Sequence, residues 1–164
     1  MKVLDVPPPP ETVVAPIRNS VRALILQQNR VLLLRKRGPD GAERYAMPGG
    51  GQDAGERLHH ALIRECMEEL GTRVDILGLL HVAEAFKPAG GKQTSYRQQV
   101  EFIFQCRVPA VYVPRNGSKP DKHQQGVDWI GLQHLEQVDL RPAGMATLIR
   151  RAALCSEPVY LGDI

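Results

Sequence analysis

Hydrophobic positions recur along the chain with two different periods, and each period predicts a different kind of element. One row repeats at every fourth position: Leu58, Leu62, Cys66 and Leu70. This spacing predicts an amphipathic helix, and Gly71 stands where a helix C-cap belongs. Between residues 100 and 108 every second residue is apolar instead, which predicts a strand over about 97–108.

Shorter apolar runs and turn residues predict the remaining elements. Further strands are expected at 21–26, 30–34, 74–80 and 127–130, with a short segment at 45–47. Loops are expected at 38–41, 48–51, 87–95 and 114–126. The last of these is polar, and we expect it to be mobile. A final helix is predicted from Leu140 to about Cys155, because Pro142 suits a first helical turn.

The order of these elements predicts the fold class. Several strands, a helix, more strands and a helix indicate an α/β (α+β) fold, an α/β/α sandwich built around a mixed sheet. With 164 residues, 43% of them hydrophobic and 24% charged, the chain has the composition of one globular domain. We expect this domain to span residues 18–164, after a proline-rich tail or arm at residues 1–17.

Composition also restricts the surroundings and partners of the protein. The apolar runs are far shorter than the ~20 residues of a membrane-spanning helix, and the first residues lack a secretory signal, so we expect a cytoplasmic protein with no membrane partner. A net charge of +3 and 5% aromatic residues argue against nucleic acid as a partner. Three cysteines lack the spacing of a zinc or redox site and are expected in the core: Cys66, Cys106 and Cys155.

Candidate chemistry is concentrated in residues 50–72. On a helix, Glu65, Glu68 and Glu69 lie on one arc beside the apolar row. Crowded carboxylates at the edge of a buried face are unfavourable unless a cation neutralises them. The alternative is a solvated acidic face, because like-charged pairs cost only about 0.2–0.5 kcal/mol. The glycine loop at 48–51 favours the cation, since its backbone can offer a carbonyl ligand and contact phosphates. Such hard oxygen ligands select Mg²⁺ or Mn²⁺.

This segment resembles the box of the Nudix hydrolases, G-x5-E-x7-R-E-U-x-E-E-x-G-U, in which U is a bulky aliphatic residue. The matching positions are Gly50, Glu56, Arg64, Glu65, Glu68, Glu69 and Gly71. Cys66 and Thr72 depart from the pattern at U positions, which affects packing more than chemistry. The run 45–50 and Trp129 are also similar to family features, so that the resemblance covers about residues 20–155.

The resemblance implies Mg-dependent hydrolysis of a pyrophosphate bond in a nucleoside diphosphate linked to another moiety, such as a nucleoside triphosphate or ADP-ribose. The partner would be a small nucleotide-derived substrate. The alternative is a non-catalytic nucleotide-sensing or regulatory domain, although such domains commonly lose box carboxylates that this chain retains. RNA processing and isomerisation of a prenyl diphosphate are less favoured. A homodimer bridged by the proline-rich arm is compatible with the sequence.

The resemblance also implies roles for individual residues. Glu65, Glu68 and Glu69 would bind the metal ion together with the Gly50 carbonyl, and Glu56 would pair with Arg64. The catalytic candidates are Glu65, Glu68, Arg64 and Glu56, of which Glu65 or Glu68 could remove a proton. An acid outside the box, either Glu101 or Asp121, could remove the proton instead. The alternative for Glu101 is a polar strand residue that faces outward, and the alternative for Asp121 is a turn residue. Candidate substrate-binding residues are Arg22, Arg35, Arg44, Lys87, Glu101 and Asp121. Pro88 resembles the proline marker of ADP-ribose-cleaving members and slightly favours that substrate.

Overall fold

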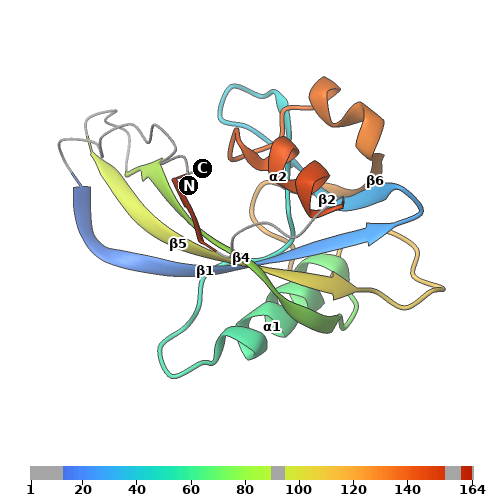
Figure 1. Cartoon of the computed structure of the whole chain (residues 1–164), viewed down its shortest axis with the longest axis horizontal. Helices are drawn as coiled ribbons and strands as arrows, with labels where there is room; N and C mark the ends of the chain where they lie inside the picture. Colours follow the sequence, from blue (N-terminus) through green and yellow to red (C-terminus); the bar gives the residue numbers. More distant parts are fainter. Residues whose placement is uncertain (1–12, 90–94, 154–159, 164) are drawn as a thin grey trace.

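The structure is a computed structural model that describes residues 13–89, 95–153 and 160–163 (Figure 1). The strands are β1 (Val13–Gln27), β2 (Arg30–Arg37), β3 (Glu43–Ala46), β4 (Asp75–Pro88), β5 (Tyr96–Arg107), β6 (Gln124–Gly131) and β7 (Tyr160–Asp163). The helices are α1 (Leu58–Leu70), the 3-10 helix η1 (Leu132–Gln137) and α2 (Met145–Ala152).

The strands form a mixed sheet with helices on both faces. Their order is β3-β2-β1-β5-β4-β7, and β6 pairs with β2. β1 runs parallel to β5 and β4 parallel to β7, whereas the other pairs are antiparallel. In Figure 1, α1 lies on one face of the sheet and α2 on the other. One apolar cluster includes Leu62 and Cys66 of α1, and a second includes Leu148 of α2. The α+β sandwich is therefore confirmed.

Helix α1 has the predicted bounds. It ends at Leu70, and Gly71 adopts the left-handed conformation with φ 65°. Leu62, Cys66 and Leu70 of the apolar row are fully buried, and Leu58 packs against the same cluster. Cys106 is also buried and, like Cys66, free, whereas Cys155 lies outside the described residues. No helix in the described ranges has both the length and the apolar character needed to cross a bilayer.

The second helix is shorter than predicted. It begins at Met145, not at Leu140, and its expected end at Cys155 lies outside the described residues. Leu140 forms an isolated bridge with Tyr45 of β3, and Arg141 N–H donates to the Tyr45 carbonyl at 2.8 Å. Pairing with a strand holds these residues out of helical geometry. The prediction failed because this contact joins segments far apart in sequence.

Several strands extend beyond their predicted bounds: β2 continues to Arg37, β6 begins at Gln124 inside the loop predicted at 114–126, and β1 and β4 depart furthest. β1 begins at Val13, inside the stretch expected to be a tail, because its first residues pair with the start of β5. Pro16, which cannot donate to a ladder, stands at the register shift between Val14 and Arg18. β4 continues to Pro88, since residues expected in a loop pair with β5 instead. Residues 1–12 of the expected tail lie outside the described residues.

The polar loop before β6 is docked against the end of α1, contrary to its expected mobility. Gly117 N–H and the Gln124 side chain donate to the Glu69 carbonyl at 3.0 and 2.8 Å. Lys119 N–H donates to the Glu68 carbonyl at 3.1 Å. The last carbonyls of a helix have no partner within the helix, and this loop supplies one. The turn of α1 that carries the glutamates is thereby fixed at its C-terminal side.

Candidate active site

The loop at residues 48–51 lies between β3 and α1 and packs directly against β1. Val21 N–H donates to the Gly50 carbonyl at 2.9 Å. Gly49 has φ +130°, which L side chains rarely adopt, and a Cβ atom there would collide with the Val21 carbonyl. A Cβ atom on Gly50 would lie 2.5 Å from the Glu65 carboxylate. These glycines therefore let the loop touch both β1 and the first glutamate of α1.

Arg64 connects the loop, the helix and Glu56. Its Nε and Nη2 donate to the two carboxylate oxygens of Glu56, both at 3.0 Å. It also donates to the Gly51 carbonyl at 2.9 Å and to Glu65 Oε1 at 2.8 Å. The hydrogen bonds from Arg64 lower the pKa of Glu56, and those to Glu56 raise the pKa of Arg64. The structure thus brings together the two residues expected to pair.

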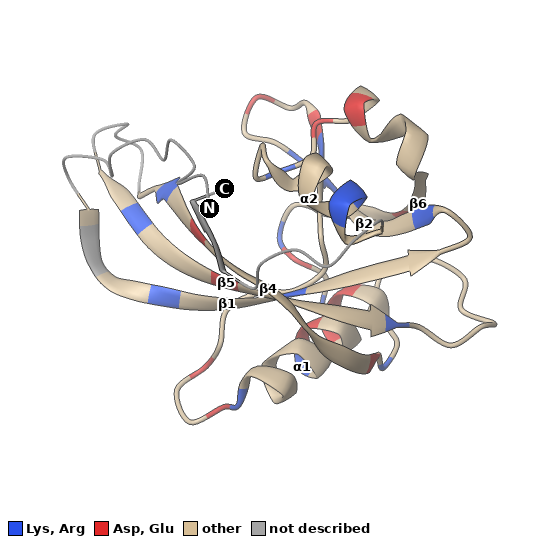
Figure 2. Ribbon diagram, viewed as in Figure 1, with Lys and Arg blue, Asp and Glu red and all other residues tan. Residues whose placement is uncertain are grey.

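Glu69 is the buried member of the three glutamates. It is 3% exposed, and its Oε2 accepts the Gly49 N–H at 2.8 Å. Burial raises the pKa of Glu69 to about 7, although the Gly49 hydrogen bond and the charge of Lys36 act in the opposite direction. Figure 2 shows other acidic positions along the same helix. A nearby cation would stabilise the charged form of such a carboxylate, so Glu69 suits a cation site.

Glu65 and Glu68 lie beside a positive charge in this structure. Arg64 Nη1 is 2.8 Å from Glu65 Oε1 and 3.8 Å from Glu68 Oε1. Within the described part of the chain, no three His, Cys, Asp or Glu side chains converge closely enough to hold a metal ion. The donor chemistry nevertheless fits Mg²⁺ or Mn²⁺, because both ions take carboxylate and carbonyl oxygens. The Gly50 carbonyl keeps one lone pair beside its bond to Val21.

A pocket of about 510 Å³, here named the basic pocket, adjoins the glycine loop at Met47. Five cationic side chains line it: Arg22, Lys36, Arg44, Lys87 and Arg141. The rest of its lining is apolar: Ala46, Met47, Phe86, Pro88, Pro142, Ala143 and Met145. Guanidinium and ammonium groups bind phosphates, and an apolar wall with an aromatic ring can cover a nucleobase. The pocket therefore suits an anionic nucleotide.

Three of the expected substrate-binding residues line the basic pocket: Arg22, Arg44 and Lys87. Arg35 does not, because its Nε pairs with Asp128 at 3.1 Å and its Nη1 lies 3.8 Å from Glu43. Successive strand residues point to opposite faces, so Lys36 occupies the pocket in its place.

Sequence reasoning missed Lys36 and Arg141. Residues 31–34, which precede Arg35 and Lys36, are all apolar and all buried. With apolar layers on both faces of the sheet, no alternation indicates which side chain faces the pocket. Arg141 reaches the pocket through its backbone pairing with Tyr45, a long-range contact without a local signal.

Glu101 is fully buried, contrary to the alternative of an outward-facing strand residue. Its carboxylate lies 2.8 Å from Arg22 Nε and 3.1 Å from Lys87 Nζ, so that three adjacent strands each contribute one charge. Burial alone would raise the pKa of Glu101, but the charges and hydrogen bonds of Arg22 and Lys87 outweigh it and lower the pKa. This carboxylate is an anchor for two cations of the basic pocket.

Asp121 lies in the loop before β6 and pairs with Lys36 at 2.5 Å. Burial opposes its charge, but the hydrogen bond and charge of Lys36 lower the pKa of Asp121 overall. The residue is therefore at the margin of the basic pocket and is bound to one of its lining cations.

Comparisons with known proteins agree with this geometry. The NUDIX domain profile matches residues 16–152. Nucleoside triphosphatase NudI of Klebsiella pneumoniae (strain 342) is 30% identical over 148 residues, which cover 84% of this chain and 98% of that protein. Nucleoside triphosphatase NudI of Enterobacter sp. (strain 638) is 28% identical over 137 residues, which cover 79% and 94%.

A solved structure is similar over nearly the same range. The crystal structure of a MutT NUDIX hydrolase from Burkholderia pseudomallei superimposes with a TM-score of 0.66 at 26% identity, and covers 84% of this chain and 100% of that one. The profile match spans most of the chain and includes the box residues on the glycine loop and α1. The chain therefore belongs to the Nudix (MutT-like) family of hydrolases, which act on phosphorus-containing acid anhydrides.

Proposed function

We propose that the protein hydrolyses a pyrophosphate bond in a nucleoside diphosphate linked to another moiety, and that it uses Mg²⁺ or Mn²⁺. The observation that carries this proposal is the position of Gly49 between the basic pocket and the glutamates. Arg22, which lines the pocket, donates to the Gly49 carbonyl at 2.6 Å, and Gly49 N–H donates to Glu69 at 2.8 Å. A phosphate bound in the pocket would therefore lie next to the carboxylates.

Each group then has a defined task. Glu65, Glu68 and Glu69 would hold the ion together with the Gly50 carbonyl. A bound divalent ion supplies positive charge to phosphate oxygens and lowers the pKa of water. The cations of the basic pocket would bind and orient the phosphates, while Arg64 and Glu56 keep the loop against α1. Because the NudI relatives are named nucleoside triphosphatases, a nucleoside triphosphate is the first substrate class to test, and ADP-ribose the second.

Removal of a proton from the attacking water needs a carboxylate that can accept it. Glu101 is the poorest candidate, since its carboxylate is enclosed by Arg22 and Lys87. Glu68 has the most exposed side chain of the three box glutamates on α1, at 26%, and its contact with Arg64, at 3.8 Å, is longer than the 2.8 Å contact of Glu65. We assign proton removal to Glu68 or, if the loop before β6 shifts, to Asp121.

The test is a substrate panel with Mg²⁺: nucleoside triphosphates, ADP-ribose, NADH, dinucleoside polyphosphates and nucleotide sugars. We expect release of a nucleoside monophosphate from at least one substrate, abolished by EDTA and restored by Mg²⁺ or Mn²⁺. Binding of the panel without turnover would instead indicate a nucleotide-sensing domain. Full activity in the presence of chelator would exclude the metal site.

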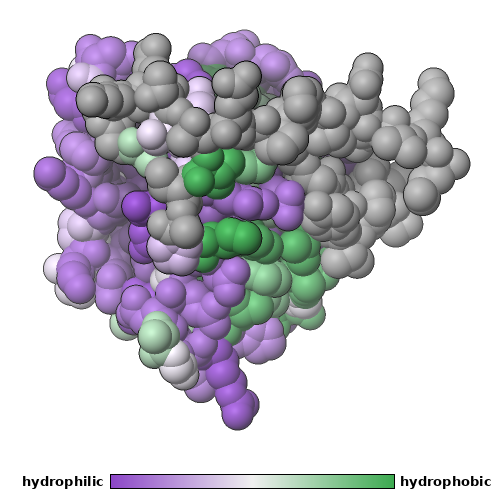
Figure 3. Space-filling model, turned by 90° about the vertical axis from the view of Figure 1, so that its left-hand side faces the viewer, coloured by the Kyte–Doolittle hydropathy of each residue, from purple (hydrophilic) through white to green (hydrophobic). Residues whose placement is uncertain are grey.

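We also propose that two copies of the chain associate through the surface where β1 begins. Figure 3 faces this side of the molecule and shows an apolar band between hydrophilic regions. Val13 and Ile17 at the start of β1 are 40% and 58% exposed. Sedimentation of the wild type and of Ile17→Asp tests the association, and a monomeric wild type would exclude it.

A cytoplasmic location stays a prediction from the sequence.

A further inference from the structure

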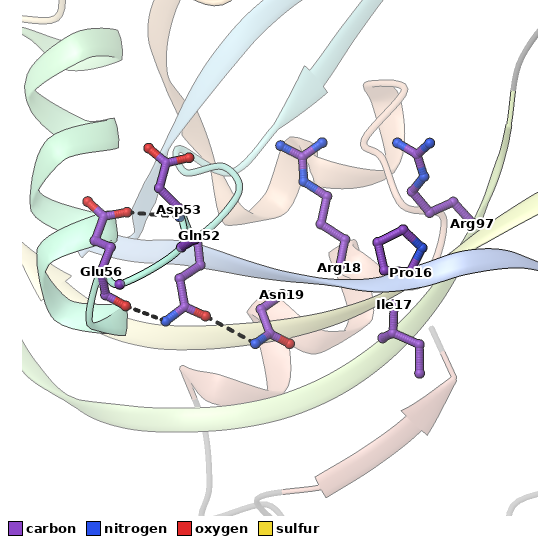
Figure 4. Close-up of a pocket in the computed structure, with 10 residues that line it drawn as sticks. Pro16, Ile17, Arg18, Asn19, Gln52, Asp53, Glu56 and Arg97 are labelled. Carbon is purple, nitrogen blue, oxygen red and sulfur yellow. Dashed lines mark hydrogen bonds between the residues drawn. The ribbon is translucent and has the colours of Figure 1, made fainter.

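A second pocket, of about 550 Å³, lies on the other side of the glycine loop, between the first half of β1 and the segment before α1 (Figure 4). We name it the edge pocket. It is lined by Pro16, Ile17, Arg18, Asn19, Arg97 and residues 52–56. Gln52 fixes one wall, because it joins Asn19 and the Glu56 carbonyl by hydrogen bonds of 3.0 and 2.6 Å.

The edge pocket carries two guanidinium groups that have no partner among the residues that the structure describes. In Figure 4, Arg18 and Arg97 point to the same side of β1. They come from neighbouring strands, since Arg18 pairs in register with Gln99, two residues beyond Arg97. Neither arginine forms an ion pair or side-chain hydrogen bond with any described residue, whereas every arginine of the basic pocket is paired with a carboxylate.

The acidic residues of the edge pocket do not neutralise these arginines. Glu56 is bound by Arg64 at 3.0 Å, and Asp53 lies 3.7 Å from the same guanidinium. The positive charge of Arg64 therefore offsets these two carboxylates in part, and the charge of Arg18 and Arg97 remains available. Two guanidinium groups that line one pocket and point to the same side of β1 suit a phosphate, which accepts several hydrogen bonds at once.

The two pockets flank the box residues. Along the loop, Met47 lines the basic pocket and Gln52 lines the edge pocket, while Gly50 between them lies against Glu65. Along β1, Arg22 lines the basic pocket and Arg18 the edge pocket, on the same face of the strand and about 13 Å apart at ~3.3 Å per residue.

The strand between the pockets is held in place and polar. Ser20, midway between Arg18 and Arg22, forms an isolated antiparallel β-bridge with Gly51, and its hydroxyl accepts a hydrogen bond from the Gln99 side chain at 3.1 Å. Ser20 and Gln99 are both buried, and Gln99 Oε1 has no partner among the described residues. A substrate spanning this distance would have one end in each pocket and its anhydride near the glutamates.

We propose, resting on the hydrolase function proposed above, that the edge pocket binds the distal part of the substrate, on the far side of the scissile bond from the nucleoside. Arg18 and Arg97 select a distal part that ends in a phosphate. This group is either the terminal phosphate of a nucleoside triphosphate or the phosphate of a phosphorylated sugar. An uncharged distal sugar gains nothing from the two arginines.

The experiment compares the double variant Arg18→Gln/Arg97→Gln with Arg73→Gln, an exposed arginine outside both pockets. Three substrates share the adenosine: ATP, ADP-ribose and ADP-ribose 1″-phosphate, which carries its additional phosphate on the distal ribose. For the double variant we expect kcat/KM to fall roughly ten- to a hundredfold for the substrates with a terminal phosphate, and to change less than about twofold for ADP-ribose. Loss with ATP alone, or with the phosphorylated sugar alone, identifies the source of the phosphate. Equal losses for all substrates, or none, would overturn the proposal.

A binding measurement separates this proposal from the hydrolase function itself. Calorimetric titration with inorganic pyrophosphate in the presence of EDTA needs no turnover. We expect the double variant to bind pyrophosphate at least about tenfold more weakly than the wild type, and Arg73→Gln to bind it equally well. A wild type that hydrolyses nothing would contradict the proposed function alone. Pyrophosphate affinity unchanged in the double variant, or reduced as much in Arg73→Gln, would contradict the edge pocket.

Discussion

Arg64 binds both carboxylate oxygens of Glu56 at 3.0 Å, and this pair fixes the segment before α1 to the helix. Replacement of Arg64 by Lys keeps the charge but loses the planar fork that makes the two bonds. We expect Arg64→Lys to lower the free energy of unfolding by about 1–2 kcal/mol, and to lower kcat because Glu65 loses its contact. Chemical denaturation and steady-state kinetics measure the two effects.

A double-mutant cycle with Glu56→Gln is the control for that pair. The side chains are 30% and 16% exposed, so their coupling free energy is expected to be modest, on the order of 1 kcal/mol. Additive effects of the two substitutions would mean that Arg64 acts through the Gly51 carbonyl and Glu65 instead.

Glu101 is the buried charge on which two cations of the basic pocket depend. Glu101→Gln leaves Arg22 and Lys87 without their counter-charge, and breaking such a buried pair costs about 3–5 kcal/mol. We expect a loss of stability of that order by urea denaturation, with a higher KM for nucleotide because the two cations lose their fixed positions. Glu84→Gln on β4 is the control, since no ion pair of Glu84 is found among the described residues.

The same carboxylate predicts a pH dependence. Its pKa in the folded protein lies below the unfolded value of 4.5, because the attraction of Arg22 and Lys87 exceeds the effect of burial. Its contribution to stability is therefore complete above pH 4.5 and is lost as the pH falls through the lower folded pKa. The difference in unfolding free energy between wild type and Glu101→Gln should shrink below that pH. A constant difference down to pH 3 would contradict the ion-pair assignment.

Local patterns predicted α1 and its box, whereas long-range pairing decided the other boundaries. The apolar row and Gly71 sit within one helix, so their spacing alone locates it. The start of α2 was misplaced because Arg141 pairs with Tyr45, about a hundred residues away in the chain. The basic pocket could not be predicted from the sequence for the same reason, because long-range pairing brings together its cations from four strands and the segment before α2.

Charge in the sequence did not show which carboxylates are paired. Glu101 was a candidate base on the strength of its position in a strand, but its environment depends on the register of three strands. Arg35 and Lys36 are adjacent and chemically alike, and only the face of β2 separates them. Such questions need coordinates, because strand parity is invisible where both faces are buried.

Gly117 lies so close to the end of α1 that a Cβ atom there would collide with the Glu68 carbonyl. We expect Gly117→Ala to displace the loop from the helix and to cost about 1–3 kcal/mol, in the range of overpacked sites. Turnover should also fall, because the turn that carries Glu68 and Glu69 loses its cap. Gly78→Ala is the control: nothing lies within 4 Å of its added methyl group, so its melting temperature should stay close to the wild type.

Replacing Glu69 on α1 is expected to change the stability in opposite directions with and without a metal ion. Without metal, Glu69→Gln removes a buried carboxylate whose charge is poorly compensated, so the variant should be at least as stable as the wild type. With Mg²⁺ at a hundred times its dissociation constant, a bound ion stabilises the wild type by about 2.7 kcal/mol, and the variant should gain little of this. Glu68→Gln should likewise lose the Mg²⁺-dependent rise in melting temperature, together with about a hundredfold or more of the turnover.

Glu136→Gln, on η1 and paired only with Arg150 among the described residues, is the matched control and should keep both the Mg²⁺ response and the activity. Thermal scans with EDTA and with Mg²⁺ distinguish a metal-binding role of Glu69 from a purely structural one. If the carboxylate were purely structural, its loss would destabilise the variant equally in both scans. A buried metal ligand destabilises the metal-free fold and stabilises the metal-bound one. A metal-binding role is therefore identified only if the difference in melting temperature between wild type and variant changes sign between the two scans. An equal response of wild type and Glu69→Gln to Mg²⁺ would remove Glu69 from the site.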